Sequence, residues 1–337
     1  MTVKTSNRQS LLRKFGQSEI SVLLVALIVL SVVTYLLKPV FLSQRNIMNT
    51  LRQISLSAIC GFGLTLIILA GEIDLSVGSQ QAVAGIVSVL VLNSTKSVLL
   101  AILAALLAGV VVGAINGLIV TKLKINSLIA TLGTMAIWRG ASMVYTQAVS
   151  IQSSVDAFQQ LATGFIGPIP NAVVMAVVIF AAIYFLLNYT TFGRYIYVIG
   201  GNQDAARFAG LPVARVKMAV YIIGSVLTMF AGVLLASRMA SAQPTAGTGL
   251  EMIVIASIIL GGVSLSGGIG SIVGATIGMV ILGVLQNALT LMDVSSFWQD
   301  ISRGVVIILA VALDVLRKER VAKSLISDQK LAREEVK

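Results

Sequence analysis

The chain has 337 residues, with 24 Lys and Arg against 13 Asp and Glu, which gives a formal net charge of +11. Only 11% of the residues are charged and 57% are hydrophobic, whereas a soluble domain normally carries about twice that charged fraction. This composition excludes an ordinary soluble protein and indicates many membrane segments. With no His and a single Cys, disulfide scaffolds, imidazole metal sites and His-based catalysis are excluded as well. We therefore expect no metal site and no cofactor.

The basic excess does not indicate a nucleic-acid partner, because it is not clustered with aromatic residues on a polar face. The first apolar stretch, residues 20–37, follows a basic start and ends in Lys38 and Pro39 without a small-residue cleavage site. We interpret it as a retained membrane span and not as a signal peptide.

Ten apolar runs predict an all-α polytopic membrane protein with about ten transmembrane helices, because a bilayer core of about 30 Å requires about 20 apolar residues per helix. The runs are 20–37, 53–70, 75–92, 98–120, 126–146, 171–188, 217–237, 252–263, 270–289 and 302–316. All five prolines fall between them, where a missing N–H breaks no helix. The run 252–263 is short, so it either spans the membrane or is re-entrant.

Lys and Arg are divided unequally between the two sides that this topology creates. If the N-terminus is cytoplasmic, 17 of them fall inside and five outside, with Arg139 and Arg303 within or at the ends of spans. The positive-inside rule therefore predicts that both termini are cytoplasmic. The expected organisation is a cytoplasmic segment 1–19, a transmembrane domain 20–316 with a cytoplasmic loop 190–217, and a basic cytoplasmic tail 317–337.

Two sequence echoes suggest an internal repeat. Glycines spaced by four occur at Gly109, Gly113 and Gly117 and again at Gly270, Gly274 and Gly278, in segments that share V-G-A-x-x-G. This spacing lets helix backbones pack closely. A second echo joins IILAGEIDLS at 67–76 to IILGGVSLS at 258–266. Either the core is duplicated, as in many transporters, or membrane helices simply reuse the same small and apolar residues.

The loop 190–217 contains the signals of a complete short helix. Asn202 is a typical N-cap, Asp204 lies in the first turn, and Gly210 followed by Pro212 ends it. Such a helix either lies on lipid headgroups, with Arg207 near phosphates, or fits a groove on a soluble partner.

Polar and aromatic residues share one face of the run 126–146. Hydroxyl groups and rings suit a sugar, whose OH groups need partners, but the same residues also hold membrane helices together or mark the interface. The candidate pathway residues are Thr131, Thr134, Trp138 and Tyr145. Asp74, Arg139 and Asp300 are either gating charges or, for the two aspartates, solvated caps at helix starts.

Five blocks in order resemble the permease family of ATP-binding-cassette monosaccharide importers, which carry ribose, xylose, arabinose or galactose, and the likeness is closest to ribose permeases. The blocks are GEIDLSVGS at 71–79, NSLIATLGTM at 126–135, GRYIYVIGGNQDAARFAGLPVARVK at 193–217, SAQPTAGTG at 241–249 and ILGGVSLSGGIGSIVG at 259–274. The likeness covers residues 20–316. It departs from the family at Glu72, where these permeases commonly have a small or neutral residue.

The resemblance implies a subunit of the bacterial cytoplasmic (inner) membrane that works as a dimer with a second permease copy. It also implies an extracytoplasmic sugar-binding protein and a cytoplasmic ATP-binding subunit as partners. In that family the segment 200–210 forms the coupling helix that contacts the ATPase. The residues that take this role by resemblance are Gly200, Gly201, Asn202, Asp204, Ala205, Ala206, Arg207 and Gly210.

No Lys is preceded by Gly, so the phosphate-binding G-x-x-x-x-G-K-[ST] motif is absent. The chain is therefore expected not to be an enzyme, and ATP hydrolysis belongs to a separate subunit. The predicted function is the transmembrane permease of an ATP-driven importer of ribose or another pentose. The alternative is an ion-coupled secondary sugar transporter, for which a carboxylate or His relay at the midplane would be expected. The sequence leaves the identity of the sugar open.

Overall fold

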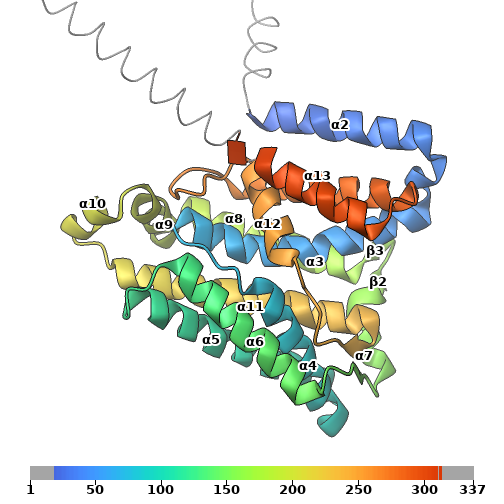
Figure 1. Ribbon diagram of the computed structural model, residues 1–337, viewed down its shortest axis with the longest axis horizontal. Helices are drawn as coiled ribbons and strands as arrows, with labels where there is room; N and C mark the ends of the chain where they lie inside the picture. Colours follow the sequence, from blue (N-terminus) through green and yellow to red (C-terminus); the bar gives the residue numbers. More distant parts are fainter. Residues whose placement is uncertain (1–18, 310, 313–337) are drawn as a thin grey trace, which may run out of the picture.

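The computed structural model describes residues 19–309 and 311–312, and almost all of its regular structure is helical (Figure 1). The longer helices are α2 (Glu19–Leu37), α3 (Gln44–Leu69), α4 (Val77–Thr95), α5 (Val98–Thr121), α6 (Ser127–Thr146), α8 (Asn171–Tyr189), α11 (Val213–Met239) and α13 (Ile272–Leu291). The shorter ones are η1 (Pro39–Leu42), α7 (Asp156–Thr163), α9 (Thr191–Gly201), α10 (Gln203–Phe208) and α12 (Leu250–Leu260). A last described helix covers residues 296–309.

Seven of the described helices are long and apolar enough to cross a membrane, namely α2, α3, α4, α5, α8, α11 and α13. The chain is therefore a multi-pass membrane protein. A helix also lies at each of the other three predicted runs, but α12 has only 11 residues, and α6 carries hydroxyl groups and Arg139 that lower its hydropathy. The last run was predicted at 302–316, and its residues beyond 312 lie outside the described part of the chain.

Several helix ends differ from the predicted ones. Helix α3 begins at Gln44 and not at residue 53, because the Ser43 hydroxyl accepts a hydrogen bond from the Asn46 N–H at 3.4 Å and caps a polar first turn. Four two-residue strands were not predicted either. β1 (Ile151–Gln152) pairs with β4 (Ser241–Ala242), and β2 (Phe165–Ile166) pairs with β3 (Ile169–Pro170), both antiparallel.

The short elements lie at opposite ends of the helix bundle. Figure 1 shows α9 and α10 at one end and α7 with β2 and β3 at the other. The loop 190–217 thus holds two helices where one was predicted. One end of the bundle is therefore formed by the short helices α9 and α10, and the other by α7 together with the strands β2 and β3.

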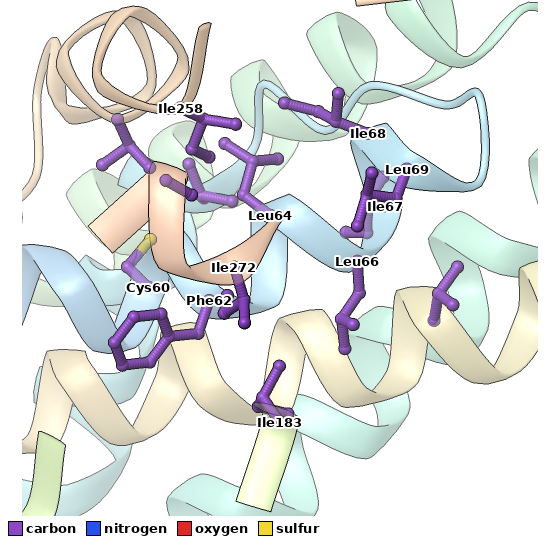
Figure 2. Close-up of a cluster of buried hydrophobic side chains, with 14 of the residues drawn as sticks. Cys60, Phe62, Leu64, Leu66, Ile67, Ile68, Leu69, Ile183, Ile258 and Ile272 are labelled. Carbon is purple, nitrogen blue, oxygen red and sulfur yellow. The ribbon is translucent and has the colours of Figure 1, made fainter. Parts of the chain in front are cut away.

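Helix α3 forms the core of the molecule. Every residue from 58 to 70 is buried, because α3 packs against α8, α11, α12 and α13. Figure 2 shows its apolar side chains beside Ile183 of α8, Ile258 of α12 and Ile272 of α13. Helix α2 is the opposite case: only 11% of its span is buried, and it lies along α13 at the edge of the bundle (Figure 1).

The predicted glycine rows are confirmed as packing faces at five of their six residues; the exception is Gly270, which lies before α13 and has a φ of 132°. A Cβ added at Gly113 would lie 2.6 Å from the Ile222 Cα of α11, and Gly109 and Gly117 face the same helix. A Cβ at Gly278 would lie 2.0 Å from the Ser257 carbonyl oxygen of α12. The first row therefore seats α5 on α11, and the second closes the α12–α13 pair.

The two similar segments 67–76 and 258–266 each contain the end of a helix, and the two helices end in the same way. At the end of α3, Gly71 has a φ of 78° and the Glu72 N–H donates to the Ile67 carbonyl at 3.0 Å. At the end of α12, Gly262 has a φ of 86° and the Val263 N–H donates to the Ile258 carbonyl at 3.2 Å. Both are glycine-terminated helix caps of one type, so the two segments are similar in local structure as well as in sequence.

Candidate functional site

Helix α10 is a preformed element at the end of the bundle. The Asn202 side chain accepts a hydrogen bond from the Ala205 N–H at 2.9 Å. At the other end Gly210 has a φ of 81°, and the Leu211 N–H donates to the Ala206 carbonyl at 3.0 Å. The predicted N-cap and the predicted stop are therefore both confirmed. Ala206 is buried, whereas Phe208 is 92% exposed, so α10 presents a large apolar side chain to its surroundings.

The glycines assigned to the coupling helix belong to a different helix. Gly200 and Gly201 are the last residues of α9, and Asn202 separates them from α10. The segment 200–210 is thus two helix ends and not one helix, because the Asn202 side chain starts a new helix at the point where its backbone is extended.

Gly200 makes the closest backbone contacts in this region. A Cβ there would lie 1.8 Å from the Leu69 carbonyl oxygen and 2.6 Å from the Gly268 nitrogen. The same Gly268 N–H donates to the Leu69 carbonyl at 2.9 Å. The end of α9, the end of α3 and the loop before α13 therefore meet backbone to backbone. In contrast, a Cβ at Gly201 would meet nothing within 4 Å.

Lys217 connects α10 to the segment that follows α3. Its Nζ donates to the Glu72 carboxylate and to the Gln203 side-chain oxygen, and both members of the ion pair are nearly buried. Glu72 lies just after α3, and Gln203 is the first residue of α10. The Lys217 ammonium group thus joins the first residue of α10 to the segment between α3 and α4. These three residues border a cavity of about 430 Å³, the α10 cavity, which Lys124 and Arg207 also line.

The segment 72–76 between α3 and α4 is held by a buried polar network around Asp74. The Asp74 carboxylate accepts hydrogen bonds from the Ser76 N–H at 2.8 Å, from the Gln80 amide at 3.1 Å and from the Asn116 amide at 3.3 Å. Asp74 is fully buried. The interpretation of Asp74 as a solvated cap is therefore wrong: it caps the chain before α4, but inside the protein.

The four residues predicted for the pathway lie on α6 and differ in their surroundings. Thr131 and Thr134 are buried, and the Thr131 hydroxyl accepts from the Leu75 N–H at 3.1 Å and donates to the Ser127 carbonyl at 2.7 Å. Trp138 packs beside Ala84, Val112 and Met229, and Tyr145 is 65% exposed. None of the four borders the α10 cavity or the cavity around Gln81 described next. Their role in a pathway stays a prediction.

A larger cavity, here called the Gln81 cavity, lies between six parts of the chain and measures about 520 Å³. Its polar lining comes from α3, α4, α11, the segment before α12 and the last described helix. These residues are Gln53, Ser57, Gln81, Arg238, Thr248 and Arg303. No local sequence pattern indicates these residues, because they are distributed over five segments that are far apart in the chain.

The remaining ionisable candidates have structural partners. Arg139 donates to the Pro244 and Ala246 carbonyls at 2.6 and 2.8 Å, which fixes the segment before α12. Asp300 is exposed and pairs with Arg303 at 2.7 Å. Among the described residues, no group of three or more His, Cys, Asp or Glu side chains is arranged to hold a metal ion.

Comparisons with known proteins agree on the class of this chain. The family model described as "Branched-chain amino acid transport system / permease component" matches residues 46–311. The ribose import permease protein RbsC of Bacillus subtilis is 45% identical over 86% of this chain and 90% of its own length. RbsC of Escherichia coli K12 is 42% identical over 86% and 92%, and the L-arabinose permease protein AraH of Azospirillum brasilense is 37% identical over 84% and 83%. No solved structure matches the chain.

Proposed function

Because this chain belongs to the family of permease components of branched-chain amino acid transport systems, we propose that it is the membrane subunit of an ATP-driven importer of a monosaccharide, ribose or another pentose. The observation that carries the proposal is its 45% identity to a ribose import permease over 90% of that protein's length. The chain itself is a transport subunit and not an enzyme. Its motor is a separate ATP-binding subunit.

The cargo is a sugar and not an amino acid, although the family description names the latter. The relatives at 37–45% identity are ribose and L-arabinose permeases, and each aligns over more than four fifths of both chains. Both sugars are neutral pentoses. A pentose is therefore the first substrate to test.

The coupling contact is formed by α10 together with the end of α9. Three observations support this part of the proposal: α10 is capped at both ends, Phe208 is exposed, and Lys217 ties Gln203 to Glu72. Closure of an ATPase dimer against α10 would move the backbone between α3 and α4 through that buried ion pair. The residues of the contact are Gly200, Gly201, Asn202, Asp204, Ala205, Ala206, Arg207 and Gly210, with Phe208 added.

The chain resides in the bacterial inner membrane and crosses it ten times, with both termini cytoplasmic. The excess of Lys and Arg on one side supports this orientation, as does the position of α10 and α7 at opposite ends of the bundle (Figure 1). On this orientation α12 and the segment before it form the short eighth crossing. The terminal segments 1–18 and 313–337 lie outside the described residues.

The partners of the importer complete the proposal. A second permease copy forms the dimer, a sugar-binding protein delivers the sugar on the side of α7, and the ATP-binding subunit docks on α10. Reconstitution tests this assignment: vesicles that contain the chain, its ATPase and its binding protein should accumulate ribose only when ATP is inside the compartment that holds the ATPase. Accumulation by the chain alone, driven by an ion gradient, would identify a secondary transporter and overturn the proposal.

A further inference from the structure

The Gln81 cavity has the size and lining of a binding site for a small polar molecule. Its walls come from α3, α4, α11, the segment before α12, α12 itself and the last described helix, and Gln53, Met239 and Thr248 at its rim are exposed. It shares no lining residue with the α10 cavity. A molecule in one cavity is therefore separated from the other by protein.

Gln81 itself points to a ligand. The residue is 4% exposed and lines the cavity, and within the described part of the chain its side-chain amide forms no hydrogen bond. Its amide atoms are not among the fully buried unpaired polar atoms, so they open into the cavity. A polar side chain that faces a cavity without a protein partner is available to a bound molecule. A bound molecule that donates and accepts hydrogen bonds would satisfy it.

The charged groups that line the cavity are two arginines, one of which is already paired. Arg303 is held by the Gln286 side chain at 2.8 Å and by Asp300 at 2.7 Å, so its charge is already paired. Arg238 is half-buried, and among the described residues it has no ion-pair partner. One guanidinium therefore remains to donate hydrogen bonds, beside amide groups that both donate and accept.

The apolar residues that line the cavity also suit a sugar ring. Leu235, Leu250 and Ile253 line the same cavity, and a sugar ring has C–H groups that pack on apolar side chains. A polyol needs donors, acceptors and an apolar wall together, because each hydroxyl both donates and accepts. An amino acid would need an acidic partner for its ammonium group, and none of the residues that line the cavity is acidic.

The base of the cavity is fixed by close backbone contact. A Cβ at Gly247, whose φ is 70°, would lie 2.4 Å from the Gly78 carbonyl oxygen. Gly78 lies in the first turn of α4, and Gln81 lies three residues further on. The start of α4 therefore carries both the ligand-facing amide and the contact that closes the cavity below it.

From this geometry we propose that the Gln81 cavity is the site in which the permease holds a neutral monosaccharide during transport, with Gln81 and Arg238 bonded to its hydroxyl groups. This assignment rests on the proposed function. It also places the link between Lys217 and Glu72 at the other end of the segment that leads into α4, so that ATPase movement and sugar release act on the same stretch of backbone.

The first test uses reconstituted vesicles with the complete transporter. Gln81→Leu keeps the side chain's size but removes its hydrogen bonds, and we expect about a tenfold lower rate of ribose uptake, which corresponds to the loss of a hydrogen bond in a binding site. The matched control is Gln152→Leu, because Gln152 is exposed on β1 and does not line the cavity. Unchanged uptake by Gln81→Leu would overturn the proposal.

A second test does not depend on the folding of Gln81→Leu. Thr248 lines the cavity and is exposed, so Thr248→Cys should react with a maleimide in vesicles that contain the permease alone. Saturating ribose should slow this reaction at least fivefold, whereas the reaction of Gln152→Cys should not change. Equal rates with and without ribose would refute binding in the cavity. Failure of ATP-dependent uptake by the wild-type complex would instead refute the importer function, and the two failures are therefore distinguishable.

Discussion

Lys217 at the start of α11 and Glu72 after the end of α3 form a buried ion pair, although 145 positions of sequence separate them. The same ammonium group also donates to the Gln203 side chain of α10. The pair therefore joins α10 to the core of the molecule through a charged contact that a neutral residue at position 72 could not form.

Removal of one member of this pair is expected to destabilise the protein more than removal of both. Lys217→Met leaves a buried carboxylate without its cation, which costs about 3–5 kcal/mol. Lys217→Met combined with Glu72→Gln leaves neither position charged and should recover most of that loss. Thermal unfolding of the purified variants in detergent measures the difference. A double variant no more stable than Lys217→Met would contradict this account of the pair.

The two adjacent glycines at the end of α9 should tolerate substitution differently. Gly200→Ala places a methyl group against the Leu69 carbonyl oxygen and the Gly268 nitrogen, whereas Gly201→Ala meets open space. We expect Gly200→Ala to lower ribose uptake at least tenfold, by analogy with overpacking in tight cores, and Gly201→Ala to leave it nearly unchanged. Uptake rates at equal membrane abundance check this prediction. Equal effects of the two substitutions would show that backbone contact at Gly200 does not matter for transport.

Substitutions on α10 should separate docking from folding. Arg207 and Phe208 are both exposed, so Arg207→Glu and Phe208→Ala are expected to leave the thermal stability unchanged. Each should reduce co-purification of the ATP-binding subunit, because α10 loses a charge or an apolar anchor for the contact. Binding of the sugar-binding protein on the opposite side should persist. A helix that merely lies on lipid headgroups predicts a smaller effect, since one surface charge near anionic lipid contributes about 1 kcal/mol.

The glycine rows provide a packing test with internal controls. Gly113→Leu and Gly274→Leu force side chains into the backbones of α11 and α12, so both should lower the yield of folded protein severely. Gly133→Leu and Gly140→Leu on α6 meet nothing within 4 Å and should be nearly silent. Fluorescence-detected gel filtration measures the folded fraction. A loss at Gly133 as large as at Gly113 would indicate that an unobserved partner covers α6.

Labelling from each side of the membrane checks the ten-crossing topology. Cys60, the single cysteine, is fully buried and should not react. A cysteine at Thr163 should react with an impermeant maleimide from outside, and one at Ala209 only from inside. A cysteine introduced at Lys330, in the tail, is expected to react only from inside, like the cysteine at Ala209. Reaction of Thr163 and Ala209 from one side would refute the model of ten crossings.

Much of the helical content was predictable from the sequence, because apolar runs of bilayer length leave few alternatives. The ends of helices were less predictable. Helix α3 extends nine residues beyond its apolar run, since Ser43 caps a polar first turn that hydropathy assigns to a loop. Helix α9 was missed because Gly193 and Gly200 weaken helix signals, although in the fold they allow close contact with α8 and α3.

The site was predictable only where its signals are local. The caps at Asn202 and Gly210 are encoded within a few residues of α10, and both were predicted correctly. The Gln81 cavity and the Lys217 contact join segments that are far apart in sequence, so no local sequence pattern predicts them. Asp74 was misassigned for the same reason, since Asn116, which donates to it, lies on another helix.

The polar network of segment 72–76 also bears on the order in which the helices assemble. The Ile73 and Leu75 N–H groups bond to the Ser127 and Thr131 hydroxyls of α6, at 3.2 and 3.1 Å. Asp74 needs the Asn116 amide of α5. The partners of this segment therefore come from two helices that follow it in the chain, so we expect residues 72–76 to reach their final conformation only after α5 and α6 have been synthesised and have packed against α4.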